Sequence, residues 1–182
     1  IGYGAFRGCT SLTSVTFEGT SKVTSIGTGT FNRCSKLTSI TIPDSVESIG
    51  FGAFYGCTSL TSVTISDSVE SIGNYTFEHC TSLTSVTFEG TSKVTSIPTG
   101  AFYQCTSLAS ITIPNSVESI GSATFRECAS LASITIPNSV ESIGEQAFRG
   151  CASLTTVYLT RNSPLLQRNG GTLTPGDNKD FY

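Results

Sequence analysis

The sequence is poor in charge and in residues that mark catalytic or nucleic-acid-binding proteins. Its 182 residues include no Met, no Trp and one His, and 13% of them are charged, with a net charge of −3. The Lys and Arg residues are scattered, which excludes the basic surface that nucleic-acid binding requires. No apolar run approaches the roughly 20 residues of a membrane span. The chain opens in mid-repeat at Ile1, so we expect a fragment, in which a missing export signal is uninformative.

Catalytic and metal-binding motifs are also scarce. The single histidine, His79, has no nucleophile at a telling spacing, and Ser and Thr are too numerous for any one of them to mark a site. A metal site needs clustered ligands, whereas the cysteines are spread at wide, regular intervals along the chain. We therefore predict a non-enzymatic protein with no cofactor and no metal site.

What the sequence does contain is a repeated Cys-x-x-Leu tetrapeptide. The tetrapeptide returns at a nearly constant interval along the chain, and a Phe stands three places before each cysteine. A fixed period in the twenties predicts a solenoid, in which each short coil buries its apolar side only against its neighbours. The cysteines are Cys9, Cys34, Cys57, Cys80, Cys105, Cys128 and Cys151.

One cysteine at the same place in every coil predicts a column of buried thiols. Equivalent residues of stacked coils lie about 4.8 Å apart with parallel Cα–Cβ bonds, whereas a disulfide needs Cβ atoms that face each other. Free cysteine is also among the most buried residue types. We expect seven reduced, structural thiols, so the cysteine count does not indicate a cellular compartment.

The coil of residues 57–77 illustrates the expected structure. Residues 60–65, Leu-Thr-Ser-Val-Thr-Ile, end in alternating apolar and hydroxyl side chains, which predicts a short strand with one wet face. Val69 and Ile72 form a second apolar segment after a polar turn. Gly73 is expected to allow a corner with positive φ. The Phe and Cys that follow, three places apart, are expected to share one face of a single helical turn.

Two coils carry a two-residue insertion after the strand. The segments 17–22 and 88–93 both read Phe-Glu-Gly-Thr-Ser-Lys, and the distance between them along the chain is the length of three coils. A three-coil block has therefore been duplicated. We expect the two insertions to bulge from the same rim of the solenoid.

The repeated pattern Leu-x-x-Val-x-Ile-x-x-x-Val-x-x-Ile-Gly-x-x-Ala-Phe-x-x-Cys resembles the BspA-like leucine-rich repeats, of the treponemal type. The resemblance covers residues 1 to about 158. It departs from the commoner leucine-rich pattern, because Ser replaces the Asn of the usual buried ladder (Ser45, Ser68, Ser116 and Ser139). The resemblance implies a right-handed, curved solenoid of the α/β leucine-rich-repeat class. Such a solenoid is mostly β, has one short helical turn per coil, and carries its strands on the concave side.

We divide the chain into two parts. Residues 1–158 form the seven-coil solenoid, with an incomplete N-terminal coil, and residues 159–182 follow it. The second part lacks Cys and is rich in Asn, Gly and Pro. Its apolar residues (Leu165, Leu166, Leu173 and Phe181) are expected to fold over the last coil as a cap. The alternative is a partly ordered tail.

Two surfaces are candidate binding sites. On the concave strand face, Ser and Thr form two rows, and an aromatic anchor stands at one end. These residues are Ser14, Thr16, Ser39, Thr41, Ser62, Thr64, Ser85, Thr87, Ser110, Thr112, Ser133, Thr135 and Tyr158. On the convex side, the coils differ most and carry Tyr and Arg, which favour interfaces. These residues are Tyr55, Tyr75, His79, Tyr103, Arg126 and Arg149. Both patterns also have a purely structural interpretation. The Ser and Thr rows are then an ordinary solvated strand face, and the convex positions are loops that tolerate substitution.

The BspA-like family occurs in surface proteins of bacteria and some protozoa and is associated with adhesion. The resemblance therefore implies a secreted or cell-surface module, expected to be monomeric, that binds surface proteins or glycoproteins of a host, its matrix or other microbes. The alternative is a structural spacer that holds another domain away from the cell envelope. A third interpretation is an ice-binding solenoid acting through the Ser-x-Thr rows, which concave curvature opposes.

Overall fold

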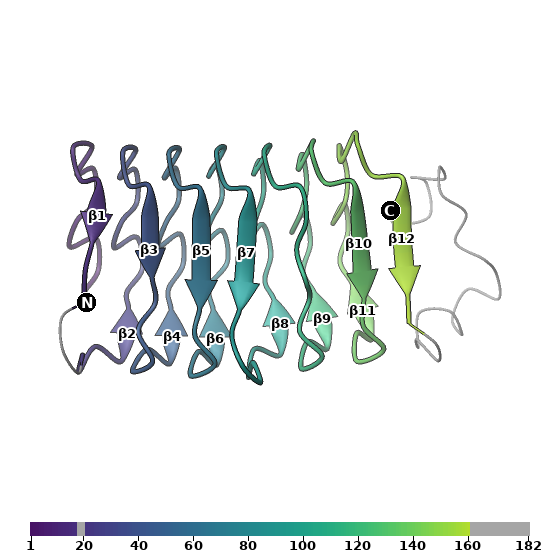
Figure 1. Cartoon of the computed structure of the whole chain (residues 1–182), viewed down its shortest axis with the longest axis horizontal. Helices are drawn as coiled ribbons and strands as arrows, with labels where there is room; N and C mark the ends of the chain where they lie inside the picture. The colour runs from purple at the N-terminus through teal and green to yellow at the C-terminus, as the bar shows by residue number, and fades with distance from the viewer. Residues whose placement is uncertain (18–20, 161–182) are drawn as a thin grey trace.

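The computed structural model describes residues 1–17 and 21–160, which wind into a solenoid of stacked coils (Figure 1). Each complete coil runs from one repeat cysteine to the residue before the next (9–33, 34–56, 57–79, 80–104, 105–127 and 128–150). Equivalent strands of neighbouring coils pair in parallel and in register, as Thr64 does with Thr87. The predicted solenoid is confirmed.

The strands lie on two sides of the solenoid. The first side, which we call the strand face, carries one sheet of β1 (Ser14–Val15), β3 (Ser39–Thr41), β5 (Ser62–Ile65) and β7 (Ser85–Phe88), and another of β10 (Ser133–Ile136) and β12 (Thr156–Leu159). The second side carries shorter strands, which lie farther back in Figure 1. They form one sheet of β2 (Ser25–Ile26), β4 (Ser48–Ile49) and β6 (Ser71–Ile72), and another of β8 (Ser96–Ile97), β9 (Ser119–Ile120) and β11 (Ser142–Ile143).

Columns of identical side chains form the core between these sides. The repeat phenylalanines stack in one column, with ring centroids 5.3–5.5 Å apart and interplanar angles of 3–13°. Columns of Leu, Val and Ile are buried beside it. Stacking arises because each coil repeats the same residue at the same place, so the period of the sequence becomes a column in space.

The predicted helical turn is wrong, because the described residues contain no helix. The residues two before and two after each Phe have positive φ, as Tyr75 (58°) and His79 (60°) do around Phe77. Every second N–H of this segment donates to the next coil, for example from Phe77 to the carbonyl of Ala101 at 2.9 Å. These bonds between coils replace the bonds within a helix. We call the segments 3–8, 28–33, 51–56, 74–79, 99–104, 122–127 and 145–150 the turn segments, and their surface the turn side.

The prediction for Gly73 is also wrong, because its φ is not positive. Gly73 and its glycine equivalents (Gly27, Gly50, Gly121 and Gly144) lie where successive backbones approach too closely for a side chain. A Cβ added at Gly50 would lie 2.5 Å from the amide nitrogen of Thr28. The fourth coil has Pro98 at this position. Because Pro98 lacks an N–H, it cannot continue the ladder from β6, and the sheet of short strands is interrupted there.

Substituting Gly50 by Ala is expected to destabilise the protein by about 1–3 kcal/mol, since the new methyl group meets backbone that cannot move aside. Gly2 occupies the equivalent place just before the first turn segment, and a Cβ there meets nothing within 4 Å. Gly2→Ala is therefore the matched control and should leave stability nearly unchanged. Urea unfolding of both variants tests this account, and equal losses would contradict it.

The cysteine column is confirmed for six of the seven thiols, which are buried, and all seven are free. Cys9 is exposed, contrary to expectation, because residues 1–8 do not complete a coil over it. Each buried thiol donates a hydrogen bond to the carbonyl of the repeat Phe that lies 26 or 28 residues before it, as Cys57 does to Phe31, at 3.0–3.2 Å. Burial, reinforced by the neighbouring thiol Cys34, raises the pKa of Cys57 to about 12.

Two predictions fall partly or wholly outside the described residues. Residues 161–182, to which the cap was assigned, are not among them, so the cap and its boundary stay predictions. Of the two insertions, 89–93 is described, whereas residues 18–20 of the other are not. No helix in the described part of the chain could cross a membrane.

Candidate binding surfaces

The hydroxyl rows predicted from the sequence form on the strand face. Parallel register aligns Ser with Ser and Thr with Thr along β1, β3, β5 and β7. The register breaks between β7 and residues 110–113 and resumes where Thr112 pairs with Thr135, after which Tyr158 continues the Thr row. Most of these side chains are exposed, and Tyr158 is 57% exposed. Within the described residues, none of the Ser and Thr hydroxyls assigned to these rows bonds another protein group. Their donors and acceptors therefore remain available to a partner.

The Thr residues just outside the rows behave differently. The hydroxyl of Thr61 donates to the carbonyl of Thr38 at 3.1 Å, and the hydroxyl of Thr84 donates to the carbonyl of Thr61 at 3.0 Å. These side chains reinforce the stacking of the coils. Hydrogen bonds between coils thus explain the hydroxyls of the Thr61 and Thr84 column, but they do not explain the two hydroxyl rows of the strand face.

Two clefts interrupt the strand face. The first cleft, of about 680 Å³, lies between walls at 15–17 and 41–43. The second cleft, of about 730 Å³, lies between 86–88 and 112–114, which are the same positions three coils later. There β7 does not pair with residues 110–113 of the next coil, and on the strand face Figure 1 shows no arrow between β7 and β10. Neither cleft was predicted from the sequence, although each lies beside a coil that carries an insertion.

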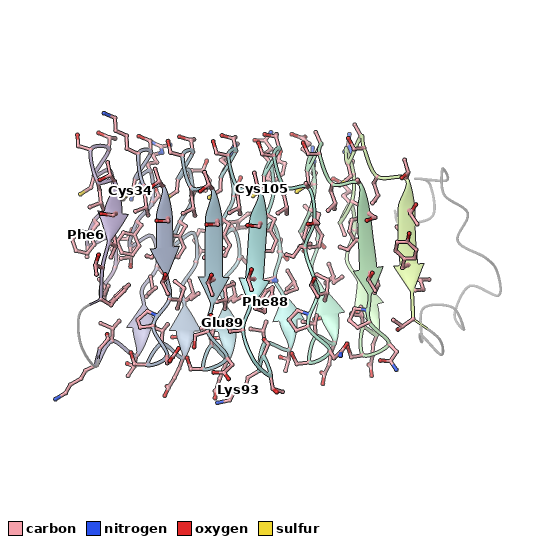
Figure 2. The ribbon with its side chains drawn as sticks, viewed as in Figure 1. Phe6, Cys34, Phe88, Glu89, Lys93 and Cys105 are labelled. Carbon is pink, nitrogen blue, oxygen red and sulfur yellow. The ribbon has the colours of Figure 1, made fainter. Side chains whose placement is uncertain are left out.

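The two clefts differ in charge. Asp44 and Glu89 line the first cleft, and Figure 2 shows Glu89 beside the lower end of β7. In the second cleft, Asn115 takes the place of Asp44. Thr160 holds the position equivalent to Glu89, since both donate an N–H to the coil before them, to Ile136 and Ile65. The first cleft is therefore acidic and the second is uncharged.

On the turn side, four of the predicted residues form a continuous stack. The His79 ring lies between those of Tyr55 and Tyr103, with centroid distances of 5.4 and 6.0 Å. The guanidinium of Arg126 lies 5.2 Å from the centre of the Tyr103 ring, a cation–π distance. Glu78 lies beside the stack, 3.5 Å from His79, and burial raises the pKa of this carboxyl while His79 lowers it.

The other two predicted residues lie apart from this stack. Tyr75 packs edge-on against Phe51, with ring centroids 5.5 Å apart. Arg149 is exposed in the last turn segment and donates a hydrogen bond to Gln146 at 3.4 Å. Among the described residues, no group of three or more His, Cys, Asp or Glu is placed to hold a metal ion.

Comparisons with known proteins identify the family. Residues 1–93 and 87–169 match the model of the BspA type leucine rich repeat region, in six copies. No curated protein matches the chain. A leucine-rich repeat protein from T. pallidum is 39% identical, with a TM-score of 0.61, over 65% of this chain and 57% of that one.

Two further solved structures are similar. A leucine-rich repeat protein from Bacteroides ovatus is 34% identical, with a TM-score of 0.66, over 76% of this chain and 35% of that one. A leucine-rich repeat protein from Eubacterium ventriosum is 27% identical, with a TM-score of 0.70, over 78% of this chain and 40% of that one. This chain thus spans less than two thirds of each of these proteins. The chain belongs to the BspA-type leucine-rich-repeat family.

Proposed function

We propose that this chain is a non-enzymatic, secreted or cell-surface module that binds proteins or glycoproteins through its strand face. The observation that carries the proposal is the pair of hydroxyl rows, whose side chains are in register and unused by the fold. Membership of a family of leucine-rich-repeat solenoids supports a role in binding. Partners on host cells, matrix or other microbes fit the adhesion associated with BspA-like repeats.

Rigid display is the proposed mechanism. The stacked core holds the strand face in place before a partner arrives, so little conformational entropy is lost on binding. The hydroxyl rows supply many modest hydrogen bonds, and the two clefts receive protruding side chains of the partner. Tyr158 supplies an exposed aromatic anchor at the end of the Thr row.

Capture of surface and matrix proteins on the immobilised chain tests the proposal against the spacer. Thr64→Glu/Thr87→Glu places two carboxylates on paired strand positions and should abolish capture, because binding would bury unpaired charges. Adjacent like charges cost about 0.2–1 kcal/mol of stability, so circular dichroism must show that the variant is folded. Saturable capture by the unmodified chain that the variant loses supports the proposal. No capture by either folded protein favours the spacer, and equal capture by both moves the site off the strand face.

A further inference from the structure

A hollow on the turn side lies near the start of the chain, apart from both clefts. Its volume is about 510 Å³, within the range of small-molecule sites. Four successive turn segments line it, through Arg7, Asn32, Arg33, Phe51, Gly52, Tyr55, Tyr75 and Glu78.

At the hollow, Gly and larger side chains hold equivalent positive-φ positions in neighbouring coils. Gly52 and Gly56 have φ of 55° and 70° and leave space where other coils carry side chains. Tyr75, in the coil after Gly52, and Arg33, in the coil before Gly56, occupy the equivalent positions and stand as walls. A Cβ built at Gly56 would lie 3.4 Å from Cγ of Arg33, so the aliphatic part of that side chain rests over Gly56.

The cationic groups of the hollow point to an anionic ligand. Arg7 and Arg33 are both exposed, and in the described part of the chain neither guanidinium forms an ion pair with a carboxylate. Arg126, which lies farther along the turn side, instead has Glu127 at 3.6 Å. Guanidinium groups bind carboxylates through paired, charge-assisted hydrogen bonds. The hollow therefore offers two unpaired donors on the surface of a protein with net negative charge.

The remaining lining groups suit a ring that carries hydroxyl groups. Phe51 is 53% exposed and lies against Tyr75, and Tyr55 is half-buried nearby, so aromatic surface faces the opening. The side-chain oxygen of Asn32 is buried and has no hydrogen-bond partner within the protein, so it is free to accept a hydrogen bond from water or from a ligand hydroxyl. Glu78 also lines the hollow and is a further acceptor, and burial raises the pKa of its carboxyl.

We propose that this hollow binds an acidic saccharide, a sugar that carries a carboxylate. The carboxylate binds Arg7 and Arg33, a C–H face of the ring lies on the aromatic side chains, and a hydroxyl donates to the oxygen of Asn32. A sugar supplies anion, apolar face and hydroxyl donors within one ring. An acidic peptide spreads these groups along an extended chain. This site is separate from the strand face, and its failure would leave the proposed function unaffected.

The test measures binding of trigalacturonic acid to the whole chain by calorimetry, beside its methyl ester, which lacks the charges. The variants take residues that other coils already carry at the same position, so the fold tolerates them. They are Arg33→Gly, as in Gly8 and Gly56, and Tyr55→Asn, as in Asn32. Arg149→Asn is the matched control, since Arg149 holds the position of Tyr55 and lies outside the hollow.

We expect Arg33→Gly and Tyr55→Asn each to weaken binding about tenfold, the methyl ester to bind at least about tenfold more weakly, and Arg149→Asn to match the unmodified chain. The strand-face variant Thr64→Glu/Thr87→Glu should also bind normally. Equal binding of acid and ester, or equal affinity of Arg33→Gly, would overturn the proposal. So would binding of the acidic peptide Glu-Tyr-Glu with no binding of the saccharide at about 10 mM.

Discussion

The solenoid is expected to unfold in mild alkali, losing roughly 5 kcal/mol of stability per pH unit between about pH 9.5 and pH 11. The cause is the column of buried thiols, of which Cys57, Cys80, Cys105 and Cys128 each lie between thiols of two neighbouring coils. Burial raises the pKa of all four, and a neighbouring thiolate would raise each further. Each of these four thiols contributes about 1.4 kcal/mol per pH unit once the unfolded chain has ionised.

The sign of the change in stability with pH depends on whether the folded or the unfolded chain binds more protons. Below about pH 8.5, the thiols are protonated in the folded and unfolded states alike, and their contribution to stability is fully present. Above that pH, the unfolded chain releases protons that the folded chain keeps, so stability falls as pH rises. For Cys57 the loss continues until the folded pKa of about 12 is reached.

Urea unfolding at a series of pH values measures this slope. The double variant Cys80→Ala/Cys105→Ala should reduce it by roughly 3 kcal/mol per pH unit, although the variant is less stable at neutral pH. A variant of the exposed thiol, Cys9→Ala, should leave the slope unchanged. Stability that stays flat up to about pH 10.5 would show that these thiols do not govern folding.

Substituting Phe77 by Ala is expected to cost about 3–5 kcal/mol. The Phe77 ring is fully buried and stacks between those of Phe54 (5.3 Å) and Phe102 (5.5 Å). Because each coil packs only against its neighbours, the cavity left by the missing Phe77 ring should also weaken the coupling between the coils before it and the coils after it. Phe6 belongs to the same column but is 41% exposed, so Phe6→Ala should cost only about 1 kcal/mol.

Urea unfolding with hydrogen exchange measures both effects of Phe77→Ala. Exchange should rise most in the coils on either side of Phe77, with the distant coil of residues 128–150 protected longest. Equal losses for the Phe77 and Phe6 variants would mean that the column does not stabilise the core.

Most of the fold could be predicted from the regular spacing of the sequence repeat. A residue type that returns once in every coil must stack, so the Phe, Leu and Cys columns follow from the sequence. The turn around Phe77 did not follow, because Phe and Cys three places apart fit a helical turn and a tight turn equally well. The hydrogen bonds that decide between them come from the next coil. Gly73 was likewise ambiguous, since positive φ and close backbone approach both select glycine.

The binding surfaces were predictable in part. Alternation along the strand placed Thr64 and Thr87 outward, and the structure agrees. The alternation does not show which hydroxyls the fold consumes, because the bond from Thr61 to Thr38 depends on how coils stack. The clefts and the hollow also depend on relations between coils. Each cleft lies between two coils, so the sequence of a single coil, including one that carries a two-residue insertion, does not reveal it.

The most direct test of binding through the strand face is the affinity of a captured partner for three forms of the chain. They are the unmodified chain, Thr64→Glu/Thr87→Glu, and Ser71→Glu/Thr95→Glu, which adds the same charge to exposed positions of the same two coils outside the strand face. We predict a loss of at least about 100-fold for the first variant and a change within about threefold for the second. Equal effects of the two variants, or a larger loss from the second, would contradict binding through the strand face.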